Sequence, residues 1–117
     1  MTREEMLRQA CKEVGFVRLR GRDGPYYVTD GNPFEDGGAW QLHEDHPALP
    51  AYVAELLVAK AMPRDVAHHL TTWAYGEVRF DYDDVADALM SAPAMTRILA
   101  SMVALGHTTI EQARGVE

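Results

Sequence analysis

Five histidines are the side chains best suited to metal or acid-base chemistry in this chain of 117 residues. His43 and His46 are separated by two acidic residues, and His68 and His69 are adjacent. A zinc or iron site needs three or four ligands that converge at about 2 Å from the metal. The first pair is one residue too close for an H-E-x-x-H motif, and adjacent residues of a helix point about 100° apart. We therefore expect no metal and no other cofactor.

Other patterns that carry catalysis are weak or missing. The single cysteine, Cys11, falls on the apolar stripe of a predicted helix, where a buried thiol stays protonated and inert. The segment that starts at Asp30 begins like a calcium loop, but it has Glu35 where a glycine is needed and Gln41 in place of the last glutamate. The sequence contains no G-x-S-x-G motif, and its glycines do not form a phosphate-binding loop. We expect the protein not to be an enzyme.

The net charge of -7 is unevenly distributed along the chain. Residues 1–22 carry six cations and three anions, which is +3, and residues 23–117 carry five cations and fifteen anions, which is -10. The larger part should repel a phosphate backbone, whereas the amino-terminal part should attract nucleic acid or an acidic protein.

Three arginines, Arg18, Arg20 and Arg22, alternate along a predicted strand and should share one face of it. Tyr26 and Tyr27 follow, and guanidinium groups beside an aromatic platform are typical of sites that hold single-stranded nucleic acid. The competing interpretation is a solvated strand face whose arginines pair with nearby acidic residues, for which Glu4, Glu13 and Asp23 are candidates.

A separate, acidic region of the sequence lies on a predicted helix, from which Asp83 and Asp87 project with few cations nearby. We call these two residues the acidic ridge. Such a surface suits a basic partner, including one that normally holds nucleic acid.

Alternating and turn-forming residues predict a small antiparallel sheet in the first part of the chain. Segments 16–20 and 26–30 read as a hairpin, and 39–43 as a third strand. Within the first strand, Val17 and Leu19 should face the core. A short alternating stretch at 77–80 predicts a further edge strand.

Apolar periodicity predicts five or six helices around this sheet. The most apolar one should be central, with Met95, Ile98, Leu99 and Met102 on one face, Ser91 as its cap and a left-handed Gly106 at its end. The first helix is expected from a capping box at Thr2 to about Gly15, and a second one ends at about Ala61. A third is expected from Pro63 to about Gly76, followed by helices at 82–90 and 92–105. The last should begin at a cap at Thr108 and end at about Gly115.

Together these patterns predict a single α+β domain over residues 1–117, with a small antiparallel meander packed against short helices. With one cysteine and no signal segment, we expect a cytoplasmic protein that does not enter membranes. The expected function is non-catalytic binding to another protein or ribonucleoprotein complex, for example by a mobile-element accessory or inhibitor protein of an anti-CRISPR-like or immunity-like kind.

Two alternative functions stay open. One is a small nucleic-acid-binding module that uses the arginines, although direct binding of nucleic acid is not the expected role. The other is a metal-dependent enzyme built on His43, His46 and His69. Partner contacts are predicted on both charged regions and on the loop between them, at Arg18, Arg20, Arg22, Tyr27, Phe34, Asp36, Asp83 and Asp87.

Overall fold

The computed structural model describes residues 2–29, 40–75 and 82–116, and the side chains of 71–75 and 82–86 are outside this description. The predicted edge strand at 77–80 lies outside the described residues. Within the described residues, six helices and three strands follow one another, which confirms the α+β class. In order they are α1 (Arg3–Glu13), β1 (Val17–Gly21), β2 (Gly24–Thr29), β3 (Trp40–His43), α2 (Leu49–Ala61), α3 (Pro63–Tyr75), α4 (Tyr82–Ser91), α5 (Ala94–Ala104) and α6 (Ile110–Val116).

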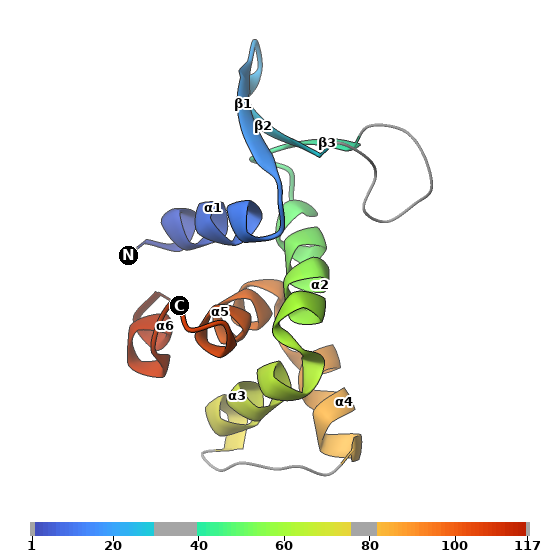
Figure 1. Ribbon diagram of the computed structural model, residues 1–117, viewed down its shortest axis with the longest axis vertical. Coiled ribbons are helices and arrows are strands. Elements are labelled where there is room, and N and C mark those ends of the chain that lie inside the picture. The colour runs from blue at the N-terminus through green and yellow to red at the C-terminus, as the bar shows by residue number, and fades with distance from the viewer. Residues whose placement is uncertain (1, 30–39, 76–81, 117) are drawn as a thin grey trace.

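The three strands form an antiparallel meander in the order β1-β2-β3, as predicted. The hairpin turn is tighter than expected, because Gly21 pairs with Gly24 and only two residues connect the strands. Gly24 has a φ of 109°, a conformation that side chains with a Cβ rarely adopt. Figure 1 shows the hairpin projecting from one end of the long axis, with α3 and α4 at the other end.

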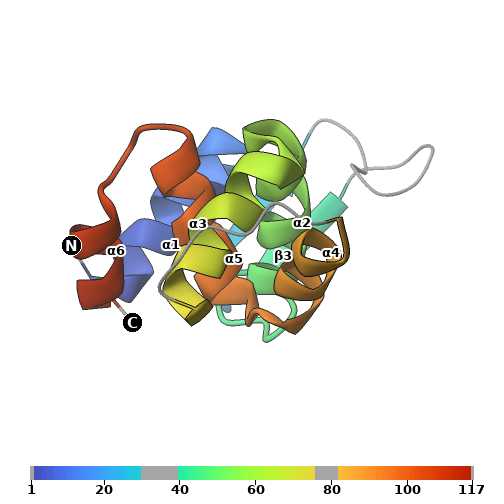
Figure 2. The ribbon, with the colours of Figure 1, turned by 90° about the horizontal axis from the view of Figure 1, so that it is seen from below.

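Helix α5 is the centre of the helical layer, as its composition predicts. Its predicted apolar face is buried: Met95, Ile98, Leu99 and Met102 pack in the main core with residues of α1 and α2. The opposite face of α5 is also covered, because Ala100 packs against Val66 and Leu70 of α3 in a second cluster. Helix α2 runs along the long axis from the sheet to α3 (Figure 1), and both termini lie beside α6 (Figure 2).

The helix ends confirm some predicted caps and correct others. Thr2 and Glu5 form the predicted capping box, and Gly106 has the predicted left-handed φ of 82°. Ser91 does not cap α5. It is the last residue of α4, where its hydroxyl donates to the carbonyl of Asp87. The cap of α6 is Thr109 and not Thr108, because Thr109 Oγ1 accepts from the amide of Gln112, and α6 starts one residue later.

The prediction that Val17 and Leu19 face the core is wrong. Both side chains are exposed, and the core residue of this segment is Phe16, which precedes the strand. Because strand side chains alternate, Phe16 and Arg18 share the face that meets the helices, and Val17 lies on the other face. Helices cover only one face of the sheet, so alternation within β1 does not tell which set is buried.

Candidate interaction surface on the sheet

Strand register divides the sheet into two faces of different character. Residues directly opposite on neighbouring strands share a face. The covered face holds Arg18 and Arg20 of β1, Pro25, Tyr27 and Thr29 of β2, and Trp40 and Leu42 of β3. The open face holds Val17 and Leu19 of β1, Tyr26 and Val28 of β2, and Gln41 and His43 of β3.

The covered face is a tightly packed aromatic core. The rings of Phe16 and Trp40 lie 4.6 Å apart between centroids, and Tyr52 of α2 meets Trp40 edge-on at 6.0 Å. Tyr27 is only 2% exposed, so its side chain belongs to the core, and its contact with a partner stays a prediction. Its hydroxyl is buried and makes no hydrogen bond with a described residue, and burial raises the pKa of the phenol.

An ion-pair network joins β1 to the first helix through Glu44, which follows β3. The guanidinium groups of Arg8 and Arg18 both donate to its carboxylate, Arg8 at 2.9 Å. The hydrogen bond from Arg18 is the largest effect and lowers the pKa of Glu44; burial opposes it, and the hydrogen bond from Arg8 lowers the pKa further. Arg18 therefore pairs with a residue that the sequence did not single out.

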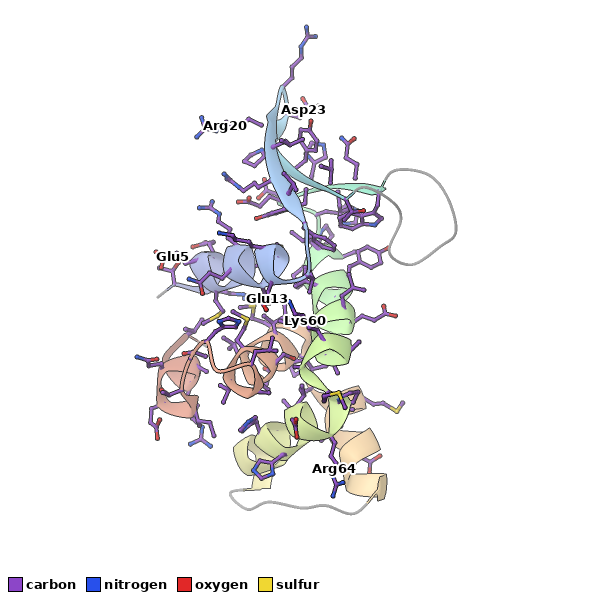
Figure 3. The ribbon with its side chains drawn as sticks, viewed as in Figure 1. Glu5, Glu13, Arg20, Asp23, Lys60 and Arg64 are labelled. Carbon is purple, nitrogen blue, oxygen red and sulfur yellow. The ribbon has the colours of Figure 1, made fainter. Side chains whose placement is uncertain are left out.

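Glu13, one of the predicted partners of the arginines, is used elsewhere. Its carboxylate contacts Lys60 of α2 at 2.9 Å and His107 at 3.2 Å (Figure 3). The Lys60 ammonium also donates to the Glu13 carbonyl at 2.8 Å. These contacts fasten the end of α1 to α2 and to the chain after α5.

The Glu44 network predicts a loss of stability in acid. Because the folded-state pKa of Glu44 is lowered, its contribution is fully present above the unfolded pKa, near 4.3, and is lost as the pH falls through the lower folded value. The melting temperature of the wild type should therefore fall more steeply than that of Glu44→Gln below about pH 5. Thermal unfolding followed by circular dichroism at a series of pH values measures this difference. Parallel curves for the two proteins would show that Glu44 has the same pKa folded and unfolded.

The exposed part of the hairpin combines apolar and cationic side chains. Val17 and Leu19 are 55% and 42% exposed, and Tyr26 is half-buried beside Leu19. Arg20 and Arg22 are exposed and form no ion pair with a described residue, and Figure 3 shows Arg20 pointing away from the body of the molecule. We call these five residues the hairpin surface.

A cavity of about 350 Å³ lies at the foot of the hairpin, between α1 and β1. Phe16, Val17 and Tyr27 contribute apolar surface to it. The remaining lining residues are all cations, namely Arg8, Lys12 and Arg18. The cavity therefore continues the mixed apolar and positive character of the hairpin surface.

The histidines predicted as possible metal ligands do not converge. His43 ends β3, and the His46 ring nitrogen Nδ1 accepts from the amide of Ala48 in the turn before α2. His69 belongs to α3 at the opposite end of the molecule (Figure 1). Among the residues whose side chains the structure describes, 2–29, 40–70 and 87–116, no group of three or more His, Cys, Asp or Glu could hold a metal ion.

Two other candidates for chemistry are buried in the fold. Cys11 is fully buried on α1, and burial raises the pKa of its thiol to about 12. His69 is half-buried, and burial, with the neighbouring His68, lowers its pKa. The buried Cys11 thiol therefore stays protonated at neutral pH and is not an accessible nucleophile.

The remaining predicted contact residues are distributed over the molecule. Phe34 and Asp36, and the side chain of Asp83, lie outside the described residues. Asp87 is exposed on α4, far along the molecule from Arg20 (Figures 1 and 3). The acidic ridge and the arginines therefore do not form one surface.

The sequence interpretation missed the apolar part of the hairpin surface, because it assigned Val17 and Leu19 to the core. A signal was present in Phe16, whose alternation puts it opposite to those two residues. No described helix is long and apolar enough to cross a membrane. Compared with models of protein families, with curated proteins and with solved structures, the chain matches none.

Proposed function

We propose that this protein acts by binding another protein through its hairpin surface, without catalysing a reaction. The observation that carries the proposal is the exposure of Val17 and Leu19, at 55% and 42%, on a strand that projects from the molecule. Adjacent exposed apolar side chains with cations at their margin are typical of protein interaction sites.

The burial and ion pairing of side chains that could act in catalysis support binding over catalysis. The Cys11 thiol is buried, and Glu44 is held ionised by two arginines. The burial of Tyr27 also weakens the nucleic-acid alternative, because it removes from the surface one of the two aromatic rings expected beside the arginines. The narrower role of a mobile-element inhibitor stays a prediction.

The test compares three versions of the full chain as affinity baits in extract of the native host. Leu19→Lys places a charge in the hairpin surface, and Met90→Lys places the same charge on a residue that is 85% exposed at the far end of the molecule. We expect quantitative mass spectrometry to find partners retained by wild type and Met90→Lys but reduced about tenfold or more by Leu19→Lys. Equal melting temperatures would show that the fold is intact.

A different pattern would contradict the proposal. If all three baits retain the same proteins, the hairpin surface is not the binding site. If an added Asp87→Lys bait loses the partners while Leu19→Lys keeps them, the acidic ridge is the binding site instead.

A further inference from the structure

Within the part of the chain that the structure describes, strand β1 has a free hydrogen-bonding edge. It is the first strand of the described sheet and pairs only with β2 there. The amide of Glu44 donates to the carbonyl of Pro25 at 3.0 Å, so the backbone of Pro25 is directed toward β3 and away from β1. In an antiparallel ladder, successive residues of a strand direct their backbone groups to alternate sides, and residues opposite one another direct theirs either toward each other or apart. Arg18 and Arg20 lie opposite Tyr27 and Pro25, so their N–H and C=O groups point outward, away from β2.

The two faces beside this edge would select different side chains in an added strand. On the open face, Val17 and Leu19 offer apolar contacts. On the other face, the neighbours are Arg18 and Arg20. Because strand side chains alternate, a fitting segment carries acidic and apolar residues in alternation.

Charge around the edge favours an acidic segment. Arg20 and Arg22 form no ion pair with a described residue, whereas Arg18 is already paired with Glu44. The cavity at the foot of β1 adds the cation Lys12, and also Arg8, which like Arg18 is already paired with Glu44. An extended segment along β1 would pass this cavity, which can take one of its side chains.

The same arginines disfavour a second copy of the chain. If two β1 strands paired antiparallel about Leu19, Arg18 of each would lie opposite Arg20 of the other. Like charges directly opposite on paired strands are destabilising. Cations on an edge strand disfavour its pairing with the same strand of a second copy, but they allow pairing with a strand of opposite charge.

We propose that β1 accepts an extended acidic segment of a partner protein as an additional strand, with alternate apolar side chains over Val17 and Leu19. Such strand addition takes its affinity from main-chain hydrogen bonds and its specificity from alternate side chains. The inference rests on the proposed function and specifies the chemistry of the partner.

Fluorescence anisotropy with short labelled peptides tests the proposal on the full chain. The first peptide alternates glutamate and valine, the second alternates lysine and valine, and the third is the glutamate peptide with every backbone amide nitrogen methylated, so that neither of its edges can donate to β1. We expect the glutamate peptide to bind about tenfold or more tightly than either of the others. The methylated peptide keeps the charge but cannot form the ladder, so it separates strand addition from simple attraction.

Charge reversal provides a second measurement. The Arg20→Glu, Arg22→Glu double variant should lose most of its affinity for the glutamate peptide and prefer the lysine peptide. Arg114→Glu, on the exposed face of α6, is a control that should leave the preference unchanged.

Several results would overturn the inference. Equal binding of the methylated and unmethylated glutamate peptides would exclude pairing at the edge. Tighter binding of a single-stranded oligonucleotide, lost in the double variant, would assign the arginines to nucleic acid. A concentration-dependent doubling of mass, abolished by Leu19→Lys, would assign the edge to a second copy.

Failure of this inference differs from failure of the proposed function. If Leu19→Lys abolishes capture of cellular partners but the glutamate peptide does not bind, the hairpin surface is a binding site for another kind of partner. If the peptide binds while capture is insensitive to Leu19→Lys, the proposed function fails.

Discussion

Replacing Tyr27 by alanine should lower the free energy of unfolding by about 3 to 5 kcal/mol, the usual cost of deleting a large aromatic side chain from a core. Tyr27 is 2% exposed and belongs to the same cluster as Phe16, Trp40 and Leu57. A cavity left at this position is enclosed by the sheet and the helices and cannot close completely. Urea unfolding followed by tryptophan fluorescence measures the change.

The matched control is Tyr27→Phe, which keeps the ring and removes only the hydroxyl. That hydroxyl is buried and makes no hydrogen bond with a described residue, and an unsatisfied polar group in a core costs about 1 to 3 kcal/mol. We therefore expect Tyr27→Phe to be at least as stable as the wild type. A loss similar to that of Tyr27→Ala would show that the hydroxyl is bonded and that the ring contributes little.

The second large effect is expected at the centre of the helical layer. Leu99 of α5 is fully buried in the main core, so Leu99→Ala should cost about 2 to 5 kcal/mol. The control is Met90→Ala, because Met90 is 85% exposed on α4 and its truncation should change stability by less than about 0.5 kcal/mol. Urea midpoints of the two variants give the comparison.

The expected result also concerns cooperativity. Leu99 packs with the main cluster, while its neighbour Ala100 belongs to the second cluster with α3. If sheet and helices unfold together, the Leu99→Ala transition shifts without a change of slope. A variant that loses only part of its helical signal at low urea would show that the two clusters unfold separately.

For the candidate site, stability measurements and binding measurements must use different residues. A Tyr27 variant that fails to bind would report damage to the core. Leu19 and Arg20 are exposed, so their substitution changes the surface without opening a cavity. Because Tyr27, one of the contact residues predicted from the sequence, is buried, Leu19 is the better residue for the binding test.

The sequence by itself determined the order of the helices and strands and the identity of the central helix. Local signals carry this information: the capping box of Thr2 with Glu5, the left-handed position of Gly106 and the apolar period of α5 each act within a few residues. These features depend on backbone geometry that a short segment specifies alone.

Only the tertiary structure decided which face of the sheet is buried and which arginines are free. Alternation places Val17 and Leu19 on one face of the sheet. Which face is buried depends on where the helices pack, and these come from distant parts of the chain. Here the helices pack on Phe16 and Tyr27. Pairing of Arg18 with Glu44, separated by 26 residues, follows from the same packing, and it leaves the hairpin surface exposed.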